Sequence, residues 1–321
     1  MKSLVTGGTG FVGGHLVDAL RRRGDVITAL VRSPSRTAAL ADQGVRLVVG
    51  DLDDHEALAR AAAGQDVVYH AAGLVAARNE TEFLRANRDG TANLLHAAEA
   101  AGARFVLVSS MAAAGPARRG APLDGSEPAH PVSAYGRSKL AGEAVVRAGA
   151  APWVVVRPPM VYGPRDREVL KVFRLARLGI GAVFGDGRQE LTAVPGADLA
   201  DALVAAGTAT AALGKTYYPC HPQIFTSSAF VAAVGRAVGR RVRTVPLPET
   251  VGRAVLALTG AAARLRGRAT ILTADKADEF FQDAWTGDPY PLTRDTGWSA
   301  QLDLDAGLAD TCRWYRERQW L

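Results

Sequence analysis

The sequence predicts an α/β protein: a doubly wound parallel sheet with a smaller, interleaved C-terminal lobe. Three observations support this fold class. Short apolar runs alternate with helix-like segments through the first half of the chain, a glycine-rich turn joins the first run to the first helix, and the alternation fades after Pro158. Strands that are apolar throughout are typical of parallel sheets covered on both faces. Right-handed crossovers then wind such a sheet outward in both directions.

The individual elements follow from hydrophobic periodicity. After a first strand that ends at Thr6, strands are expected over residues 25–31, 46–49, 66–69, 104–108 and 153–156, and the main helices over about 80–101, 132–146 and 197–211. Residues 115–131 are rich in Gly, Pro, Ser and charge and predict a surface loop. We expect residues 1–157 and 192–212 to form the sheet domain, and residues 158–191 and 213–321 mainly the smaller lobe.

Composition narrows the class of protein. The 321 residues are 48% hydrophobic, which argues against disorder. The formal net charge of +6 comes from scattered arginines rather than from the clustered stripe that nucleic-acid binding needs. The six histidines show no metal-ligand spacing, and the two cysteines give no disulfide framework. Because the first strand begins almost at Met1, we expect no leader sequence and a cytoplasmic protein without metal or nucleic acid.

One segment raises the question of a membrane. No uncharged apolar run reaches the roughly 18 residues that a membrane-spanning helix needs. The nearest candidate is Val251–Arg268, which is amphipathic in places and carries arginines at its end. Our first interpretation is a packed helix with a solvated basic end, and the alternative is a helix that contacts a membrane surface.

The glycine-rich turn near the N-terminus suits a bound pyrophosphate. Gly7, Gly10 and Gly13 follow the first strand in a G-x-x-G-x-x-G spacing and run into a helix. Glycine lets the backbone bend sharply and approach the phosphates, which the N–H groups and dipole of the helix then face. A glycine-rich turn without a ligand is the alternative. The dinucleotide contacts expected here are Gly7, Thr9, Gly10, Phe11, Val12 and Gly13.

The end of the second strand indicates which dinucleotide binds. An NAD site has a carboxylate there for the ribose 2′-OH, but here Val31 is followed by Arg32 and then Arg36. Arginine can bind a 2′-phosphate with two hydrogen bonds, so the sequence favours NADP(H) over NAD(H). Solvated surface arginines and, for Asp51, a helix cap are the alternatives. Further cofactor contacts are expected from Asp51, Leu52, Ala71, Ala72 and Gly73.

A tyrosine and a lysine stand one helical turn apart. Tyr135 and Lys139 share one face of the expected helix over residues 132–146. A free phenol has a pKa of about 10, and a nearby ammonium lowers the pKa of a phenol. Tyr135 could then exchange a proton with a carbonyl or alcohol oxygen, while Lys139 also holds the ribose of the nicotinamide.

Two serines follow the fifth strand, at the edge where open α/β sheets bind ligands. Of Ser109 and Ser110, one is expected to bind the substrate oxygen and the other to cap the strand end. Asn87, in the long helix, either anchors a relay water or bonds to backbone. Ser109 and Asn87 are counted among the cofactor contacts, together with Tyr135 and Lys139.

Several motifs together resemble the extended short-chain dehydrogenase/reductase family, of the NAD-dependent epimerase/dehydratase type. The motifs are TGGTGFVG, HAAG at residues 70–73, NRDGTANLL from Asn87, SSM, YGRSK, RPPMVYGPRD from Arg157 and the closing DTGWSAQLDLDAGLADTCRWYRERQWL. The resemblance spans the chain and implies a Rossmann fold and a homodimer. It further implies a catalytic triad of Ser110, Tyr135 and Lys139, with cofactor contacts at Pro158 and Val161.

Departures from the family pattern indicate a branch. Met111, Ala112 and Ala113 stand where dehydratases of the family carry an acid–base pair. Met160 replaces the asparagine that meets the diphosphate in sugar-nucleotide enzymes, and residues 190–192 replace their Arg-Asp-Phe segment. Each change removes a polar contact and favours an apolar site. The chain therefore looks closer to the 3β-hydroxysteroid dehydrogenase and dihydroflavonol reductase branch.

The sequence as a whole predicts an NADP(H)-dependent oxidoreductase acting on a mostly apolar small molecule, in which a carbonyl and a secondary alcohol interconvert. One alternative is a sugar-nucleotide 4-epimerase with tightly bound NAD(P). An alternative of another class is a non-catalytic dinucleotide-binding scaffold, against which the complete triad argues.

Overall fold

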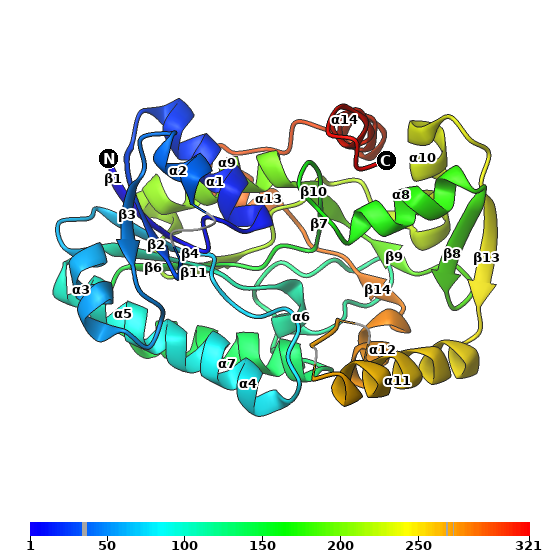
Figure 1. Ribbon diagram of the computed structural model, residues 1–321, viewed down its shortest axis with the longest axis horizontal. Coiled ribbons are helices and arrows are strands. Elements are labelled where there is room, and N and C mark those ends of the chain that lie inside the picture. The colour runs from blue at the N-terminus through cyan, green and yellow to red at the C-terminus, as the bar shows by residue number, and fades with distance from the viewer. Residues whose placement is uncertain (34–36, 268, 272) are drawn as a thin grey trace.

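A parallel sheet of seven strands forms the centre of the computed structural model, which describes residues 1–33, 37–267, 269–271 and 273–321 (Figure 1). The strand order is β11-β6-β5-β4-β1-β2-β3, so the winding reverses between β1 and β4. This is the predicted doubly wound topology. The strands are β1 (Lys2–Thr6), β2 (Val26–Val31), β3 (Arg46–Val49), β4 (Val67–His70), β5 (Arg104–Val108), β6 (Trp153–Val156) and β11 (Lys215–Tyr217).

The edge strand β11 was not predicted as a strand. It has only three residues, of which Lys215 is exposed and Thr216 half-buried, so it lacks the apolar run that marks the others. It pairs in parallel with β6, and residues 215–217 therefore belong to the main sheet.

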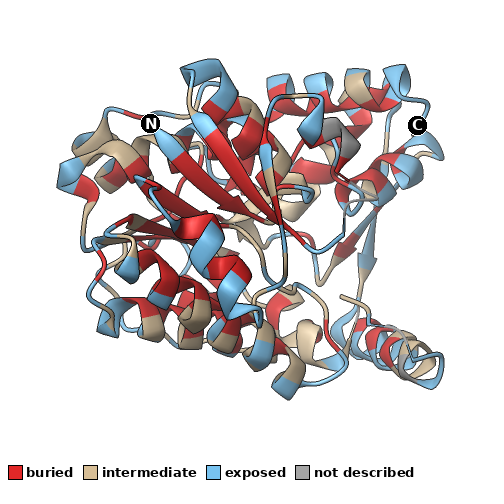
Figure 2. Ribbon diagram, turned by 60° about the vertical axis from the view of Figure 1, so that its left-hand side comes forward, coloured by how far each residue is buried: buried red, intermediate tan, exposed pale blue. Residues whose placement is uncertain are grey.

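Helices cover both faces of the sheet (Figure 1). One face carries α1 (Phe11–Arg23), α2 (Ala38–Ala41), α9 (Gly196–Thr208) and α13 (Tyr290–Thr296), and the other carries α3 (His55–Ala62), α5 (Gly90–Ala100) and α7 (Ala134–Ala148). Successive residues of each strand point to opposite faces of the sheet. Val5 packs in the core beneath α1 and α9, whereas Leu4 packs in the core beneath α3 and α5. Figure 2 shows the central strands buried between the two layers.

The long helix expected over residues 80–101 is interrupted. It consists of α4 (Glu80–Leu84), a π-helical turn over Arg85–Asp89, and α5. The backbone of α7 passes so close that a Cβ at Gly142 would lie 2.3 Å from the carbonyl oxygen of Asn87. Thr91 donates a 2.7 Å hydrogen bond to the same carbonyl. Hydrophobic periodicity carries no signal for such a one-residue expansion of a turn.

A smaller lobe lies at the right of Figure 1 and has its own core. In that core, the rings of Phe173 and Tyr315 meet edge to face at 5.2 Å. The lobe's strands are β7 (Met160–Tyr162), β8 (Ile180–Phe184), β9 (Glu190–Leu191), β10 (Ala193–Pro195), β12 (Phe225–Thr226), β13 (Arg243–Leu247) and β14 (Ala284–Trp285). Its helices are α8 (Val169–Arg177), α10 (Ser227–Val238), α11 (Glu249–Leu265), α12 (Ala274–Phe280) and α14 (Leu304–Glu317); the short α6 (Met111–Ala114) and a 3-10 turn (Thr210–Ala212) lie in connections.

His70, at the end of β4, is a buried neutral group that makes folding pH-dependent. Its Nδ1 lies 2.7 Å from the Thr6 hydroxyl and its Nε2 lies 3.1 Å from the Thr91 hydroxyl. Burial lowers the pKa of His70 to about 3 from 6.5. Below about pH 6.5 the unfolded chain therefore binds a proton at His70, whereas the folded chain does not. The contribution of His70 to the free energy of unfolding is fully present above that pH and is lost as the pH falls toward 3.

We expect His70→Gln to remove this dependence. Between pH 6.5 and 3, the free energy of unfolding of the wild type should fall relative to the variant by up to about 1.4 kcal/mol per pH unit. Urea unfolding at a series of pH values measures the difference. His96→Gln, at an exposed position of α5, is the control and should follow the wild type. Parallel acid curves for wild type and His70→Gln would contradict the prediction.

Candidate active site

A cavity of about 490 Å³ opens at the carboxyl ends of the central strands, where the strand order reverses. This is the edge at which doubly wound sheets bind ligands. The cavity brings together many of the cofactor contacts predicted from the sequence, namely Gly7, Thr9, Gly10, Arg32, Asp51, Leu52, Ala71, Ala72 and Gly73.

The glycine turn forms a cradle that side chains would fill. Gly7 has a φ of +73°, and a Cβ on it would lie 2.8 Å from the backbone nitrogen of Ala72. A Cβ on Gly13 would lie 2.1 Å from the carbonyl oxygen of Gly7. Gly10 precedes α1 and has no side chain to cap it, which leaves the first N–H groups of the helix to an anion. The cradle fits the diphosphate of a dinucleotide.

Several of the predicted cofactor contacts that the structure describes do not line this cavity. Phe11, Val12 and Gly13 form the first turn of α1, and Val12 packs against the core. The carbonyl oxygen of Pro158 accepts a hydrogen bond of 3.0 Å from the backbone of Met111. Val161 also packs against the core. Arg36 lies outside the described residues.

Both signs of charge meet at the ribose end of the cavity. Arg32 directly follows β2, is exposed and lines the cavity. Asp51 accepts a 2.9 Å hydrogen bond from the backbone N–H of Asp53 and so holds its own loop. Asp53 forms an ion pair of 2.7 Å with Arg85. Arg32 is thus the cation closest in sequence to the end of β2, where dinucleotide folds recognise the ribose.

Tyr135 lies at the start of α7 with its ring between apolar and cationic neighbours. Ser133 caps the helix, since its hydroxyl accepts a 3.0 Å hydrogen bond from the N–H of Gly136. The phenol of Tyr135 is hydrogen-bonded to Ser110, and its ring centroid is 5.8 Å from that of Phe83. The structure therefore brings two members of the predicted triad into direct contact.

The pKa of Tyr135 differs from the sequence-based expectation. We expected a nearby ammonium to lower it, but burial raises the pKa of Tyr135 to about 12, and the negative charge of Glu279 adds to this increase. The hydrogen bond with Ser110 opposes the increase only in part. Desolvation outweighs the hydrogen bond because the phenolate, not the phenol, loses its water. At neutral pH, Tyr135 is therefore a protonated phenol, able to donate a proton.

Lys139 lies one turn further along α7 and faces the sheet. Its Nζ donates a 2.7 Å hydrogen bond to the carbonyl oxygen of Val108, at the end of β5. A Cβ on Gly73 would lie 3.8 Å from this Nζ, so the amine is close to a residue that lines the cavity. Burial lowers the pKa of Lys139 to about 8, and Glu143 partly counteracts that decrease.

Ser109 and Asn87 are engaged with protein partners. The Ser109 hydroxyl is buried and donates a 2.5 Å hydrogen bond to Glu143. The amide oxygen of Asn87 accepts from the N–H of Leu74 at 2.8 Å, and its amide nitrogen donates to the Leu74 carbonyl and to Ser138. Asn87 thus fixes the loop after β4, which agrees with the backbone alternative.

A second cavity, of about 370 Å³, lies on the other side of that loop. Gly73 and Leu74 line the first cavity, whereas Val75 and Phe83 line the second. Tyr135 also lines the second cavity, whose far wall includes Gly260 of α11, residues 270, 271 and 273, and the start of α12. Tyr135 therefore faces a compartment that adjoins the nucleotide cavity.

Two residues of α12 near Tyr135 were not predicted from the sequence. The Nζ of Lys276 lies 5.1 Å from the centroid of the Tyr135 ring, and Lys276 forms an ion pair with Glu279. Glu279 in turn accepts a hydrogen bond from Ser133, the residue that caps α7. No local pattern in the sequence marks Lys276 and Glu279, because about 140 positions separate them from the start of α7 and only the fold brings α12 to α7.

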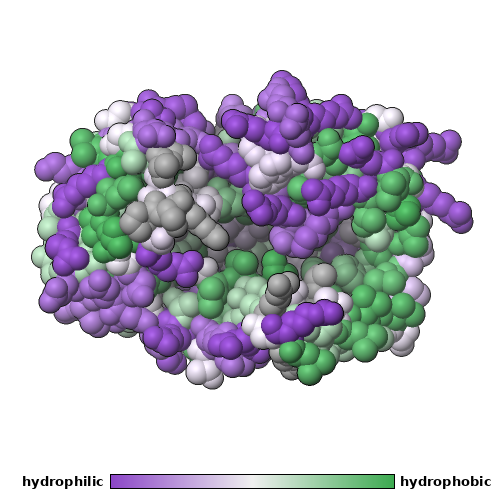
Figure 3. All heavy atoms as spheres, viewed as in Figure 1, coloured by the Kyte–Doolittle hydropathy of each residue, from purple (hydrophilic) through white to green (hydrophobic). Residues whose placement is uncertain are grey.

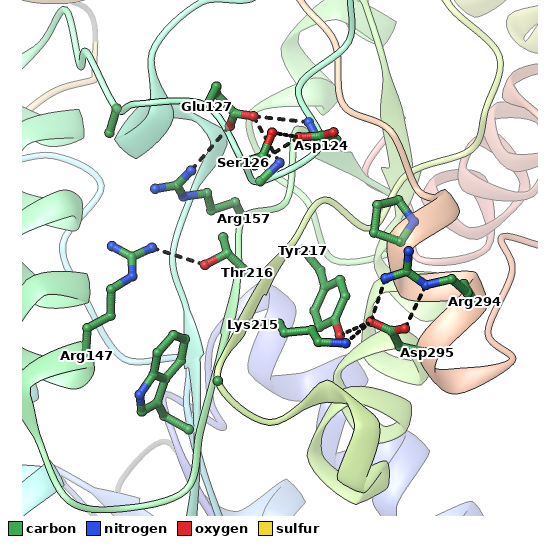
Figure 4. Close-up of a pocket in the computed structure, with 15 residues that line it drawn as sticks. Asp124, Ser126, Glu127, Arg147, Arg157, Lys215, Thr216, Tyr217, Arg294 and Asp295 are labelled. Atoms are coloured by element: carbon green, nitrogen blue, oxygen red, sulfur yellow. Dashed lines mark hydrogen bonds and ion pairs between the residues drawn. The ribbon is translucent and has the colours of Figure 1, made fainter.

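A third, polar cavity of about 570 Å³ lies along the edge strand β11 and shares no lining residue with the other two (Figure 4). Most of its charged groups have protein partners. Asp295 accepts from Lys215 at 2.8 Å and from Arg294 at 2.9 Å, Arg157 pairs with Glu127 at 3.6 Å, and Arg147 donates to Thr216. Among the described residues, none of the predicted site residues lines this cavity.

The fold and the cradle define a dinucleotide-dependent α/β enzyme, and sequence similarity identifies its family. Residues 3–218 match the profile of the family described as "NAD dependent epimerase/dehydratase family". The chain belongs to this family, and its relatives are reductases and epimerases of the extended short-chain type.

Three known proteins illustrate the similarity. Ceramide reductase of Caulobacter vibrioides is 34% identical over 99% of this chain and 95% of its own length. The 2-alkyl-3-oxoalkanoate reductase of Stenotrophomonas maltophilia is 30% identical over 96% of this chain and 97% of its own length. The structure of UDP-glucose 4-epimerase from Thermotoga maritima superposes with a TM-score of 0.80 over 99% of this chain and 100% of that one; at 22% identity it shows the fold alone.

The protein is therefore an NAD(P)-dependent enzyme of the oxidoreductase or epimerase kind that acts on small molecules. None of the helices in the described part of the chain has the length and the apolar run needed to cross a lipid bilayer.

A buried ion pair fixes the helix that carries Tyr135 and Lys139. Glu143 of α7 accepts two hydrogen bonds, of 2.9 and 2.8 Å, from Arg157, which directly follows β6. Both side chains are almost fully buried. We expect Glu143→Gln to lower the free energy of unfolding by about 3–5 kcal/mol, because it removes the buried counter-charge that the guanidinium contacts most closely and leaves only Glu127, at 3.6 Å.

Urea denaturation of the two proteins measures this change. The matched control is Asp305→Asn, which breaks an exposed pair with Arg236 and should cost about 1 kcal/mol or less. Equal losses for the buried and the exposed pair would show that the Glu143 pair has no special part in the fold.

Proposed function

We propose that the protein is an NADP(H)-dependent oxidoreductase that reduces a carbonyl to a secondary alcohol on a mostly apolar substrate. The observation that carries this proposal is the protonated phenol of Tyr135, hydrogen-bonded to Ser110 and lining a cavity next to the nucleotide cavity. A pKa of about 12 keeps the phenol protonated at neutral pH, as a proton donor to a carbonyl oxygen must be.

Each member of the triad has a separate task in this reaction. A bound reduced nicotinamide supplies the hydride. Ser110 holds the carbonyl oxygen of the substrate, and Tyr135 donates a proton to that oxygen as negative charge develops on it. Lys139 binds the ribose hydroxyls and, with its positive charge, offsets the charge left on Tyr135 after the proton has moved.

The lining of the site and the names of two relatives support the proposed substrate class. Met111, Ala112 and Ala113, which follow Ser110, are buried and carry no acid or base for dehydration. Val75, Phe83 and Ile271 contribute apolar side chains to the second cavity, which charged residues also line. The two full-length relatives are named for a ceramide and a 2-alkyl-3-oxoalkanoate, both of which carry alkyl chains. We infer a long-chain carbonyl compound, as the hydrophobic-substrate branch of the family would accept.

The second candidate function is that of a sugar-nucleotide 4-epimerase, which membership of the epimerase/dehydratase family supports. An epimerase retains NAD(P) during purification and converts a UDP-sugar without net consumption of the cofactor. Net oxidation of NADPH by long-chain ketones, with no conversion of UDP-glucose, would exclude this candidate.

Tyr135→Phe tests the proton donor. We expect kcat for reduction of a long-chain 3-oxo compound to fall by about 10²- to 10⁴-fold, because hydride transfer then lacks its proton. NADPH affinity should stay unchanged, which fluorescence titration can establish. NADPH absorbance measures the rate, and Tyr290→Phe, at an exposed tyrosine, is the control. A rate close to wild type in Tyr135→Phe would remove Tyr135 from the mechanism.

Arg32→Ala tests the cofactor preference. If Arg32 binds the 2′-phosphate, the Kd for NADPH should rise by about 10- to 100-fold, as expected for a lost charged hydrogen bond, while the Kd for NADH stays the same. Arg22→Ala is the control, since Arg22 pairs with Asp201 on the outer side of α1. Equal NADPH binding by Arg32→Ala and wild type would refute the preference for NADP(H).

A further inference from the structure

Helix α11 presents an apolar stripe to solvent. Val251, Val255, Leu258 and Leu265 recur at helical spacing on its outer side and are 48%, 48%, 72% and 90% exposed. In Figure 3, hydrophobic residues gather at the lower right, where Figure 1 places α11.

The inner side of α11 is apolar as well. Gly252, Leu256 and Gly260 are buried against the body of the protein, and a Cβ on Gly252 would lie 2.5 Å from the ring of Phe281. A helix with apolar residues on both sides is expected to be covered on both sides. The body of the protein covers only the inner one.

Charges near the stripe suit an anionic surface. Glu249, in the first turn of α11, pairs with Arg253, which also pairs with Asp278. Arg253 therefore offsets one of these two carboxylates. Arg266 follows the stripe directly and is exposed, and the whole chain carries a formal charge of +6. Anionic lipid headgroups attract such a surface.

The stripe lies next to the cavity that Tyr135 lines. Gly260, on the inner side of α11, and Ile271, after the helix, both line that cavity. A helix with its side chains is about 10 Å across, so the cavity lies about one helix diameter behind the stripe. An apolar substrate dissolved in a bilayer would have a short path around the end of α11.

We propose that α11 docks in the plane of an anionic lipid surface and that its apolar stripe inserts at the headgroup boundary. The helix has 17 residues and lies along the protein rather than projecting from it, which suits an interfacial helix (Figure 1). A second copy of the chain is a poorer occupant, because four side chains on one helix fall short of the roughly 800 Å² per partner that stable interfaces bury. This proposal rests on the proposed function and adds that the substrate enters the site from the lipid bilayer.

Vesicle flotation without substrate or cofactor tests the docking. The purified full-length protein is mixed with vesicles of phosphatidylglycerol and phosphatidylcholine, and with vesicles of phosphatidylcholine alone. We expect flotation with the anionic vesicles, reduced by added salt, and at least tenfold weaker binding for the double variant Leu258→Asp/Leu265→Asp. Leu178→Asp is the control, because Leu178 is 74% exposed but follows α8, away from the stripe.

Three outcomes would overturn the proposal: no flotation of the wild type, equal flotation of the double variant, or loss of flotation in Leu178→Asp alone. A concentration-dependent dimer that the double variant abolishes would assign the stripe to a second copy instead. Thermal unfolding verifies that the variants are folded. NADPH oxidation with a water-soluble ketone tests the proposed function separately, and the double variant should retain that activity while losing activity on vesicle-embedded ketone.

Discussion

The buried pair between Glu143 and Arg157 is the constraint on which the site depends. Glu143 belongs to the helix of Tyr135 and Lys139, and Arg157 follows the strand β6. Ser109, at the end of β5, donates to the same carboxylate. One carboxylate thus joins the helix to the ends of two strands, and its full burial makes the arrangement unfavourable to break. The positions of the phenol and the amine relative to the sheet are set by this junction.

Burial acts in opposite directions on the two titratable groups of α7. It raises the pKa of the Tyr135 phenol and lowers that of the Lys139 amine, because in both cases the charged form loses its water. The two pKa values therefore diverge, with the phenol above the amine, whereas the sequence had suggested a lowered pKa for the phenol. The phenol holds its proton firmly, and the amine is the group whose charge responds to pH close to neutrality.

Local sequence signals were sufficient for much of the fold and for parts of the site. The strands from β1 to β6 are apolar runs, and the glycine turn lines the cavity as its spacing predicted. The strand β11 was not predicted, because a three-residue strand at the edge of a sheet is partly exposed and does not need an apolar run. The neighbours of Tyr135 on α12 were not predicted, because only long-range packing brings them there. The predicted shift in the pKa of Tyr135 had the wrong direction, because the sequence does not show how far a side chain is desolvated.

The hydroxyl of Ser133 makes two hydrogen bonds: it accepts one from the N–H of Gly136 as the cap of α7, and it donates one to Glu279 on α12. Since α12 forms part of the wall of the second cavity, any outward movement of that wall also removes a contact from the start of the helix that bears Tyr135. Any entry or exit of a ligand that required α12 to move would therefore also disturb the alignment of the phenol, which would be restored only when the wall returned to its place.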